Sequence, residues 1–213
     1  FKLGETYVSL ENWPAAIKQF DLAERNMAPQ IAVYNKWLSD GVSVPLALIK
    51  IGKVREAATL LRKLHTTDAT RLGIKHYRTA QKGAVLGMAL AAQGQKKEAL
   101  AQFRQAIPIL LQRSRASDSS NSEAAKNRRL RLILEDYIKL LNDVIGTPLD
   151  PTQEAAAEAF RIADIARSRS VLGALAASGA RAAAGNPEMA KLIRSEQDAR
   201  KQISAMFGLL ANV

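Results

Sequence analysis

The sequence contains no cysteine in its 213 residues, so disulfides, thiolate zinc sites and a cysteine nucleophile are excluded within this chain. Aromatic residues make up only 5% of it, and alternating runs typical of β-strands do not occur. No apolar run approaches the roughly 18 residues that a membrane span needs. Only 7 prolines and 12 glycines interrupt a chain that is 47% hydrophobic. We therefore expect an all-α protein with closely packed helices.

Sequence motifs for catalysis are missing as well. The chain has no GxGxxG motif, phosphate loop, HExxH motif or nucleophile elbow. Its two histidines, His65 and His76, lie on different expected helices without carboxylates at ligand spacing, so we expect no metal and no other cofactor. Glu135 and Asp136 face different sides of one helix, which does not suit joint acid–base catalysis. We expect that this chain is not itself an enzyme.

The sequence does contain a repeated pattern that predicts pairs of helices. Residues 86–110 read as two antiparallel helices with a turn at Gly94, because glycine adopts the left-handed C-cap conformation without steric cost. In the second of these helices Ala99, Phe103 and Ala106 recur at spacings of four and three. They therefore share one face, with Phe103 as the large side chain between two small ones.

Two earlier segments repeat this pattern. From Leu3 onward, Glu11 takes the place of the turn glycine and Asn12 is the expected N-cap of the second helix. The residues at matching offsets are Gly4, Tyr7, Ala16, Phe20 and Ala23, against Gly87, Leu90, Ala99, Phe103 and Ala106. Residues 30–64 form a degenerate copy, with one long first helix, a stop at Gly52, and Ala57, Leu61 and Leu64 on the second helix.

The pattern of Gly, an apolar residue at +3, Gly at +7, Ala at +12, Phe at +16 and Ala at +19 resembles the tetratricopeptide repeat. Ala16, Ala57 and Ala99 are spaced by 41 and 42 residues, longer than the roughly 34 of the basic repeat and similar to the long repeats of kinesin light chains and related bacterial scaffolds. The resemblance implies a right-handed α-solenoid and a protein-interaction scaffold. An unrelated helical bundle would not explain the period.

This interpretation divides the chain into four parts. Residues 1–113 form three helix pairs, and 114–122 form a flexible Ser/Asn/Asp-rich connection. Residues 123–185 form a divergent fourth pair, and 186–213 form a terminal amphipathic helix that caps the solenoid, with a coiled coil as the alternative.

In the second helix of the divergent fourth pair, Asp150 is the expected cap and Pro151 the first residue. Ala156, Phe160 and Ala163 should restore the buried Ala/Phe/Ala face.

A second resemblance begins at Ala157. The segment AEAFRIADIARSRSVLGALA, followed by a basic amphipathic helix, resembles the region before the caspase-like peptidase domain of bacterial CHAT-family proteins. Members of that family use a His and Cys pair for cleavage, which cannot be placed here. The chain also begins at Phe1 inside a helical pattern, without Met or a signal sequence. We expect a cytoplasmic regulatory or recognition arm of a larger protein, with any peptidase domain beyond Val213.

In a solenoid of this kind the first helix of each pair lines a concave surface, because stacked repeats rotate slightly against one another. Matching repeat positions predict ten groove residues: Glu5, Ser9, Leu46, Lys50, Gln81, Ala84, Met88, Arg131, Glu135 and Lys139.

Charge indicates the kind of partner. The chain has 31 basic and 20 acidic residues, and most of the excess lies between Lys50 and Lys82. The spacing of four, three and four predicts one positive stripe along a helix, formed by Arg71, Lys75, Arg78 and Lys82. We interpret it as a basic rim of the groove that favours a protein or peptide with an acidic segment, or an adjoining domain of the same chain. A solvated helix face is the alternative, and self-association stays open.

Nucleic acid ranks lower as a partner. Aromatic side chains between basic ones would stack on bases, but only Tyr77 lies close to the stripe. Residues 127–131, NRRLR, add a short basic cluster that would bind phosphates without sequence specificity.

Overall fold

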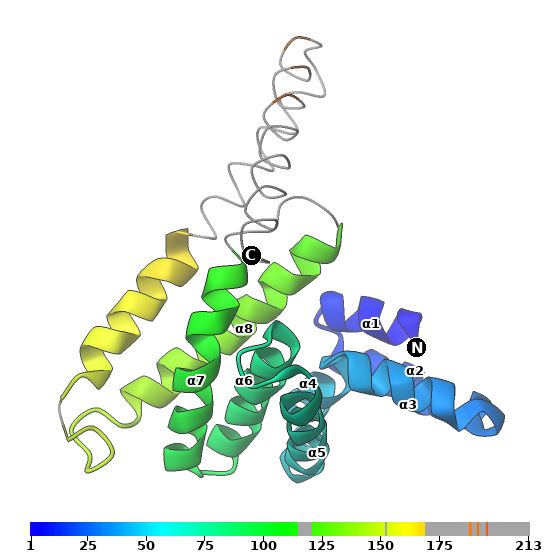
Figure 1. Cartoon of the computed structure of the whole chain (residues 1–213), viewed down its shortest axis with the longest axis horizontal. Helices are drawn as coiled ribbons and strands as arrows, with labels where there is room; N and C mark the ends of the chain where they lie inside the picture. Colours follow the sequence, from blue (N-terminus) through cyan, green and yellow to red (C-terminus); the bar gives the residue numbers. More distant parts are fainter. Residues whose placement is uncertain (115–120, 152, 169–187, 189–190, 192–194, 196–213) are drawn as a thin grey trace.

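The computed structural model describes residues 1–114, 121–151 and 153–168, and the single positions 188, 191 and 195. This part of the chain is all-helical, as its composition predicted. The helices are α1 (Lys2–Ser9), α2 (Trp13–Asn26), η1 (Ala28–Gln30), α3 (Ile31–Asp40), α4 (Ser43–Lys50), α5 (Val54–Leu72), α6 (Tyr77–Ala92), α7 (Lys96–Ser114) and α8 (Asn121–Asn142). A further helix covers residues 155–168, drawn in yellow in Figure 1.

Helices that follow one another in the chain pack side by side (Figure 1). α1 packs on α2, α4 on α5 and α6 on α7, while α2 contacts α4 and α5 contacts α6. α6 is central, since it contacts α4, α5, α7 and α8. Every residue from Thr79 to Leu90 is buried, which is typical of a helix with neighbours on all sides.

The turns expected at Glu11 and Gly94 are confirmed. Gly94 has φ 76°, the left-handed conformation that ends α6, and Glu11 adopts φ 56° in the equivalent place. Asn12 caps α2, because its side-chain oxygen accepts a hydrogen bond from the backbone N–H of Ala15 at 3.3 Å.

The buried positions of Phe20 and Phe103 are confirmed too. Each has at most 1% of its surface exposed, and each ring lies against the glycine of the preceding first helix. A Cβ atom on Gly87 would lie only 3.2 Å from the Phe103 ring, so glycine is what allows this close approach. On its other side Phe103 stacks on Tyr137 of α8, with ring centroids 4.8 Å apart.

The single long helix expected between Gln30 and Gly52 is wrong. α3 ends at Asp40 because Gly41 is extended, with φ −134° and ψ −172°, and α4 begins at Ser43. Pro45 fits the first turn of α4, where its missing N–H removes no intrahelical hydrogen bond. The sequence pattern therefore missed the break between α3 and α4, which the extended Gly41 makes and with which Pro45 is compatible.

The expected register of the last described helix is also wrong. Asp150 does act as a cap, but its Oδ1 accepts from the N–H groups of Glu154 and Ala155, so the helix begins at 155 instead of at Pro151. The buried face is Ala155, Ala159 and Ile162. Ala156 and Ala163 are exposed, and Phe160 is 76% exposed.

Contacts of Glu158 with residues distant in sequence explain this register. Its carboxylate accepts a hydrogen bond from the Tyr137 hydroxyl of α8 and two from Arg104 of α7, the closer at 3.0 Å. These contacts rotate the helix so that the face containing Ala159, and not the face containing Phe160, packs against the core. The middle of the predicted 114–122 connection, the continuation of this helix to about Ala177 and most of the terminal helix lie outside the described residues.

Candidate functional site

A groove of about 250 Å³ lies between α1, α4 and α8. Its apolar lining comes from Val8, Leu46 and Leu132, one from each of these helices, and all three are buried. Charged side chains at its edge are Lys2, Glu5, Lys126, Arg128 and Arg129. Four cations face one carboxylate, so the groove combines an apolar lining with a positive margin.

The structure places some of the ten predicted groove residues here. Glu5, Ser9 and Leu46 line the groove, although Leu46 exposes only 1% of its surface. By contrast, Gln81, Ala84 and Met88 of α6 expose 9%, 0% and 2%. They cannot contact a partner without unfolding, so this part of the prediction is wrong.

The remaining predicted groove residues form ion pairs, two of which join α8 to other parts of the chain. Lys50 of α4 binds Asp136 of α8 at 3.2 Å, and Lys139 binds the same carboxylate at 3.1 Å. The Lys50 pair joins α8 to α4, whereas the Lys139 pair lies within α8, which also contacts α6 and α7.

Closer to the start of α8, Arg131 reaches Glu11 at 2.6 Å and Glu135 at 3.4 Å. α8 therefore covers much of the surface that was expected to be open, and the groove beside α1 is what stays accessible.

Two cations of the groove, Arg128 and Arg129, are partly buried and make no hydrogen bond or ion pair with another residue in the described part of the chain. Arg129 is the one whose charge the Glu5 carboxylate attracts. Burial lowers the pKa of its guanidinium, and the phenol of Tyr77 and the carboxylate of Glu5 oppose this effect only in part. Since Glu5 already binds Lys2 at 3.1 Å, Arg129 lacks a direct counter-ion.

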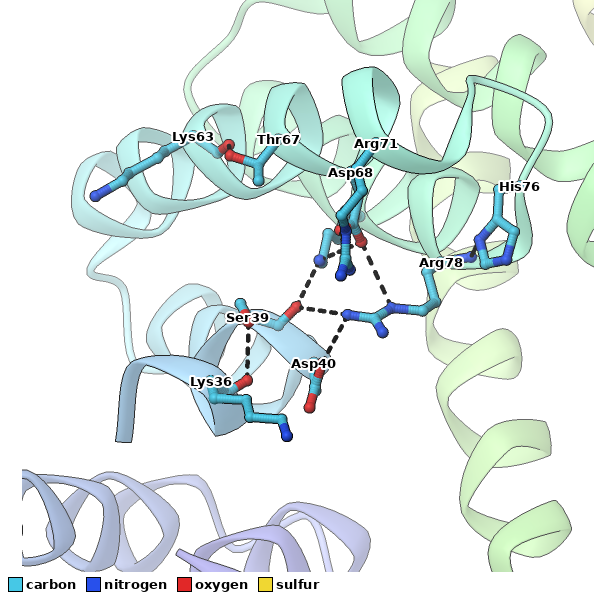
Figure 2. A network of polar contacts seen from close by, with 10 residues as sticks. Lys36, Ser39, Asp40, Lys63, Thr67, Asp68, Arg71, His76 and Arg78 are labelled. Carbon is cyan, nitrogen blue, oxygen red and sulfur yellow. Dashed lines mark hydrogen bonds and ion pairs between the residues drawn. The ribbon is translucent and has the colours of Figure 1, made fainter. Parts of the chain in front are cut away.

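The predicted basic stripe is not one helix face. α5 ends at Leu72, Gly73 follows with φ 85°, and α6 begins at Tyr77, so Arg71 and Lys82 lie on different helices. Lys75 lies between them and is exposed. Figure 2 shows Arg71 and Arg78 pointing toward Asp68 of α5.

This polar network is internal, and it ties the end of α3 to α5 and α6 (Figure 2). Lys82 is 2% exposed, and its Nζ lies 2.5 Å from Asp68 Oδ2 and 2.6 Å from the Ser39 carbonyl. Arg78 donates to the same carbonyl at 3.2 Å and to Asp40 at 2.8 Å. Cations at the C-terminal end of α3 also interact favourably with its helix dipole. Lys82 and Arg78 thus bind the chain's own groups, and the predicted rim is wrong.

The two partners of the central pair shift each other's protonation. Burial raises the pKa of Asp68, but the hydrogen bond and charge of Lys82, with Arg78 and Arg71, outweigh it and hold that pKa below its usual value. Burial lowers the pKa of Lys82, and Asp68 offsets this only in part. A buried, fully paired lysine with almost no exposed surface has no access to a substrate, so we assign the network a structural role.

The histidines do not form a site with each other. Nδ1 of His76 accepts the backbone N–H of Arg78 at the start of α6, and His65 lies against Gly83 and Gln102. Among the described residues no group of three or more His, Cys, Asp or Glu side chains could hold a metal ion. Burial lowers the pKa of His65, which favours its neutral form, and the charge of Asp68 opposes this effect only in part.

Sequence reasoning missed most of the residues that line the groove. Arg128 and Arg129 belong to the NRRLR cluster, so their charge was visible, but their place beside α1 depends on how α8 crosses the preceding helices. Val8, Ser43 and Leu132 carry no motif at all. Only the alignment of first helices, which located Glu5, Ser9 and Leu46, pointed toward this groove.

Comparison with known proteins adds no relative, because no family model, curated protein or solved structure matches the chain. Within the described residues, no helix combines the length and apolar character required to cross a membrane.

Proposed function

We propose that this chain is an α-solenoid of tetratricopeptide-like helix pairs that acts as a protein-interaction module. Two glycine–phenylalanine contacts, Gly4 with Phe20 and Gly87 with Phe103, recur at equivalent places in separate pairs, which supports the repeat interpretation. The side-by-side packing of successive pairs is consistent with it. The module binds a short segment of a partner protein.

The observation that carries this proposal is the groove between α1, α4 and α8. Its lining of Val8, Leu46 and Leu132 suits an apolar side chain, and its basic margin suits a partner segment with acidic residues. The segment binds beside α1, because α8 covers the inner face of α6 that the repeat pattern suggested.

The described contacts favour a protein partner over nucleic acid. Arg71, Arg78 and Lys82 are bound to Asp68 and so are withdrawn from phosphate binding. Among the described residues that line the groove none is aromatic, whereas single-stranded nucleic acids are held by stacking on such side chains.

A selection from a display library of random 12-residue peptides tests the proposal with the full 213-residue chain as bait. We expect enriched peptides that lose binding to Ser9→Trp, since the indole would fill the groove. Thr59→Trp, on an exposed position of α5, is the matched control and should bind them normally. Failure to enrich any peptide, or equal binding by both variants, would contradict the function.

A further inference from the structure

Arg129 carries a charge that the described chain does not neutralise. Two positions further along α8, Arg131 makes ion pairs with Glu11 and Glu135, which contribute to the fold. Among the described residues Arg129 has no such pair, and it lines the groove together with Arg128. Burying part of a cation without a counter-ion costs free energy, so the residue weakens the fold in the absence of a ligand.

Glu5 attracts Arg129 without binding it. Its carboxylate is held by Lys2 at 3.1 Å, and about a third of the side chain, 35%, stays exposed. Its charge opposes the effect of burial on Arg129, but no ion pair closes between them. An incoming carboxylate could therefore bind Arg129 without first breaking a salt bridge of that residue.

The surroundings of Arg129 restrict the ligand further. Val8 and Leu132 line the same groove and expose 6% and 7% of their surfaces, so the group next to the carboxylate must be apolar. A guanidinium binds a planar carboxylate through two parallel hydrogen bonds, which are stronger when water is excluded.

A doubly charged phosphate fits this groove less well. The nearby Glu5 carboxylate repels a dianion more strongly than it repels a singly charged carboxylate.

We propose that Arg129 anchors the partner by binding the side-chain carboxylate of an Asp or Glu that stands beside an apolar residue in the bound segment. This inference rests on the proposed function, because it names the chemistry that the same groove recognises. The apolar residue lies against Val8 and Leu132, and the carboxylate forms the pair that Arg129 lacks.

The test uses peptides that the display selection enriches and that Ser9→Trp no longer binds. We expect them to share an acidic residue next to an apolar one. Changing that Glu to Gln in the peptide, or Arg129 to Met in the protein, should each weaken binding by about tenfold or more, and the two changes together should cost little more than either alone. Arg129→Lys should bind with intermediate affinity, because an ammonium cannot form the two-point contact.

Lys139→Met is the matched control on the same helix, because its side chain is 72% exposed, pairs only within α8 and lies outside the groove, and it should keep the affinity of the parent. A stability measurement separates recognition from a structural role: Arg129→Met should melt at the same temperature as the parent or higher, since it removes a charge without a partner. Amidation of the peptide C-terminus should leave affinity unchanged, which distinguishes a side-chain carboxylate from a terminal one.

Each result decides one of the two claims. Peptides that need the groove but bind Arg129→Met as tightly as the parent, or that carry no acidic residue, would overturn the role of Arg129 and leave the interaction module standing. A lower melting temperature with unchanged peptide affinity would make Arg129 a structural residue. If no groove peptide is enriched, the proposed function itself is wrong, and the inference with it.

Discussion

The ring of Phe20 occupies the space that a side chain on Gly4 would need. A Cβ atom at position 4 would lie 2.5 Å from Cε1 of Phe20, closer than real Cβ contacts come. Phe20 cannot retreat freely, because it is 1% exposed and packs against Phe1 with ring centroids 5.0 Å apart. The close packing of α1 on α2 therefore requires glycine at position 4.

Gly4→Ala should lower the free energy of unfolding by about 1 to 3 kcal/mol, because overpacking forces the ring or the helix to move. The higher helix propensity of Ala opposes this by about 1 kcal/mol at most. Urea denaturation measures the change.

The double variant Gly4→Ala with Phe20→Leu tests the cause of that loss. Leucine is smaller, so the second change should cost less in the Gly4→Ala background than in the parent. Costs that simply add would show that the two residues do not clash.

Phe103→Ala should destabilise the protein strongly and Phe160→Ala hardly at all, although the sequence pattern predicts that both positions are buried. Phe103 is 0% exposed between Gly87 and Tyr137, so its truncation should leave a cavity and cost about 3 to 5 kcal/mol. Phe160 is 76% exposed, and its truncation should change stability by less than about 0.5 kcal/mol. Thermal unfolding of the two variants side by side checks both expectations.

The contrast between these phenylalanines shows how far the sequence could predict the fold. The contact of Phe103 with Gly87 follows from a repeat of local spacings, and so do the turns at Glu11 and Gly94. The face that Phe160 presents depends on Glu158 meeting Arg104 and Tyr137, which are distant in sequence. Helical periodicity predicts that a helix has an apolar face. It does not predict which of two adjacent faces packs against the other helices.

The candidate site was predictable only in part. Matching of first helices located Glu5, Ser9 and Leu46, but it assumed that α6 also presents residues to a partner. Where α8 lies is set by pairs such as Lys50 with Asp136, 86 residues apart, and no local pattern encodes them. The basic stripe failed for a similar reason, since the turn at Gly73 brings Lys82 back onto Asp68.

Lys82→Gln should be strongly destabilising and Lys75→Gln nearly silent, although the two charges are close in sequence. Loss of Lys82 leaves the buried Asp68 without its closest partner, which should cost about 3 to 5 kcal/mol. Lys75 is exposed, so its change should stay within about 0.5 kcal/mol. Guanidinium denaturation of both variants distinguishes an internal network from a solvated stripe.

The paired change Asp68→Leu with Lys82→Met supplies the control. Replacing both charges by apolar groups removes the desolvation cost along with the attraction, so much of the lost stability should return. If Lys82→Gln were as stable as Lys75→Gln, the buried pair would contribute nothing to the fold.

The stability of the protein should decline as the pH falls from about 7 through the ordinary titration range of histidine, and His65 should account for part of that decline. Burial is the main cause that lowers the pKa of His65 below 6.5, and the charge of Lys82 adds to it, while Asp68 opposes both. The folded state therefore binds a proton at His65 less readily than the unfolded state. Its contribution is complete above the unfolded pKa of about 6.5 and is lost as the pH falls toward the lower folded value.

His65→Gln and His65→Phe check this prediction because neither side chain titrates, while they differ in polarity. Unfolding free energies measured in urea between pH 7.5 and pH 5 should fall less steeply for both variants than for the parent. A difference between the two variants that does not change with pH reflects only packing beside Gly83 and Gln102, where His65 lies. A parent slope that survives in both variants would mean that His65 binds its proton equally in the folded and unfolded states, so that its burial between α5, α6 and α7 carries no electrostatic cost.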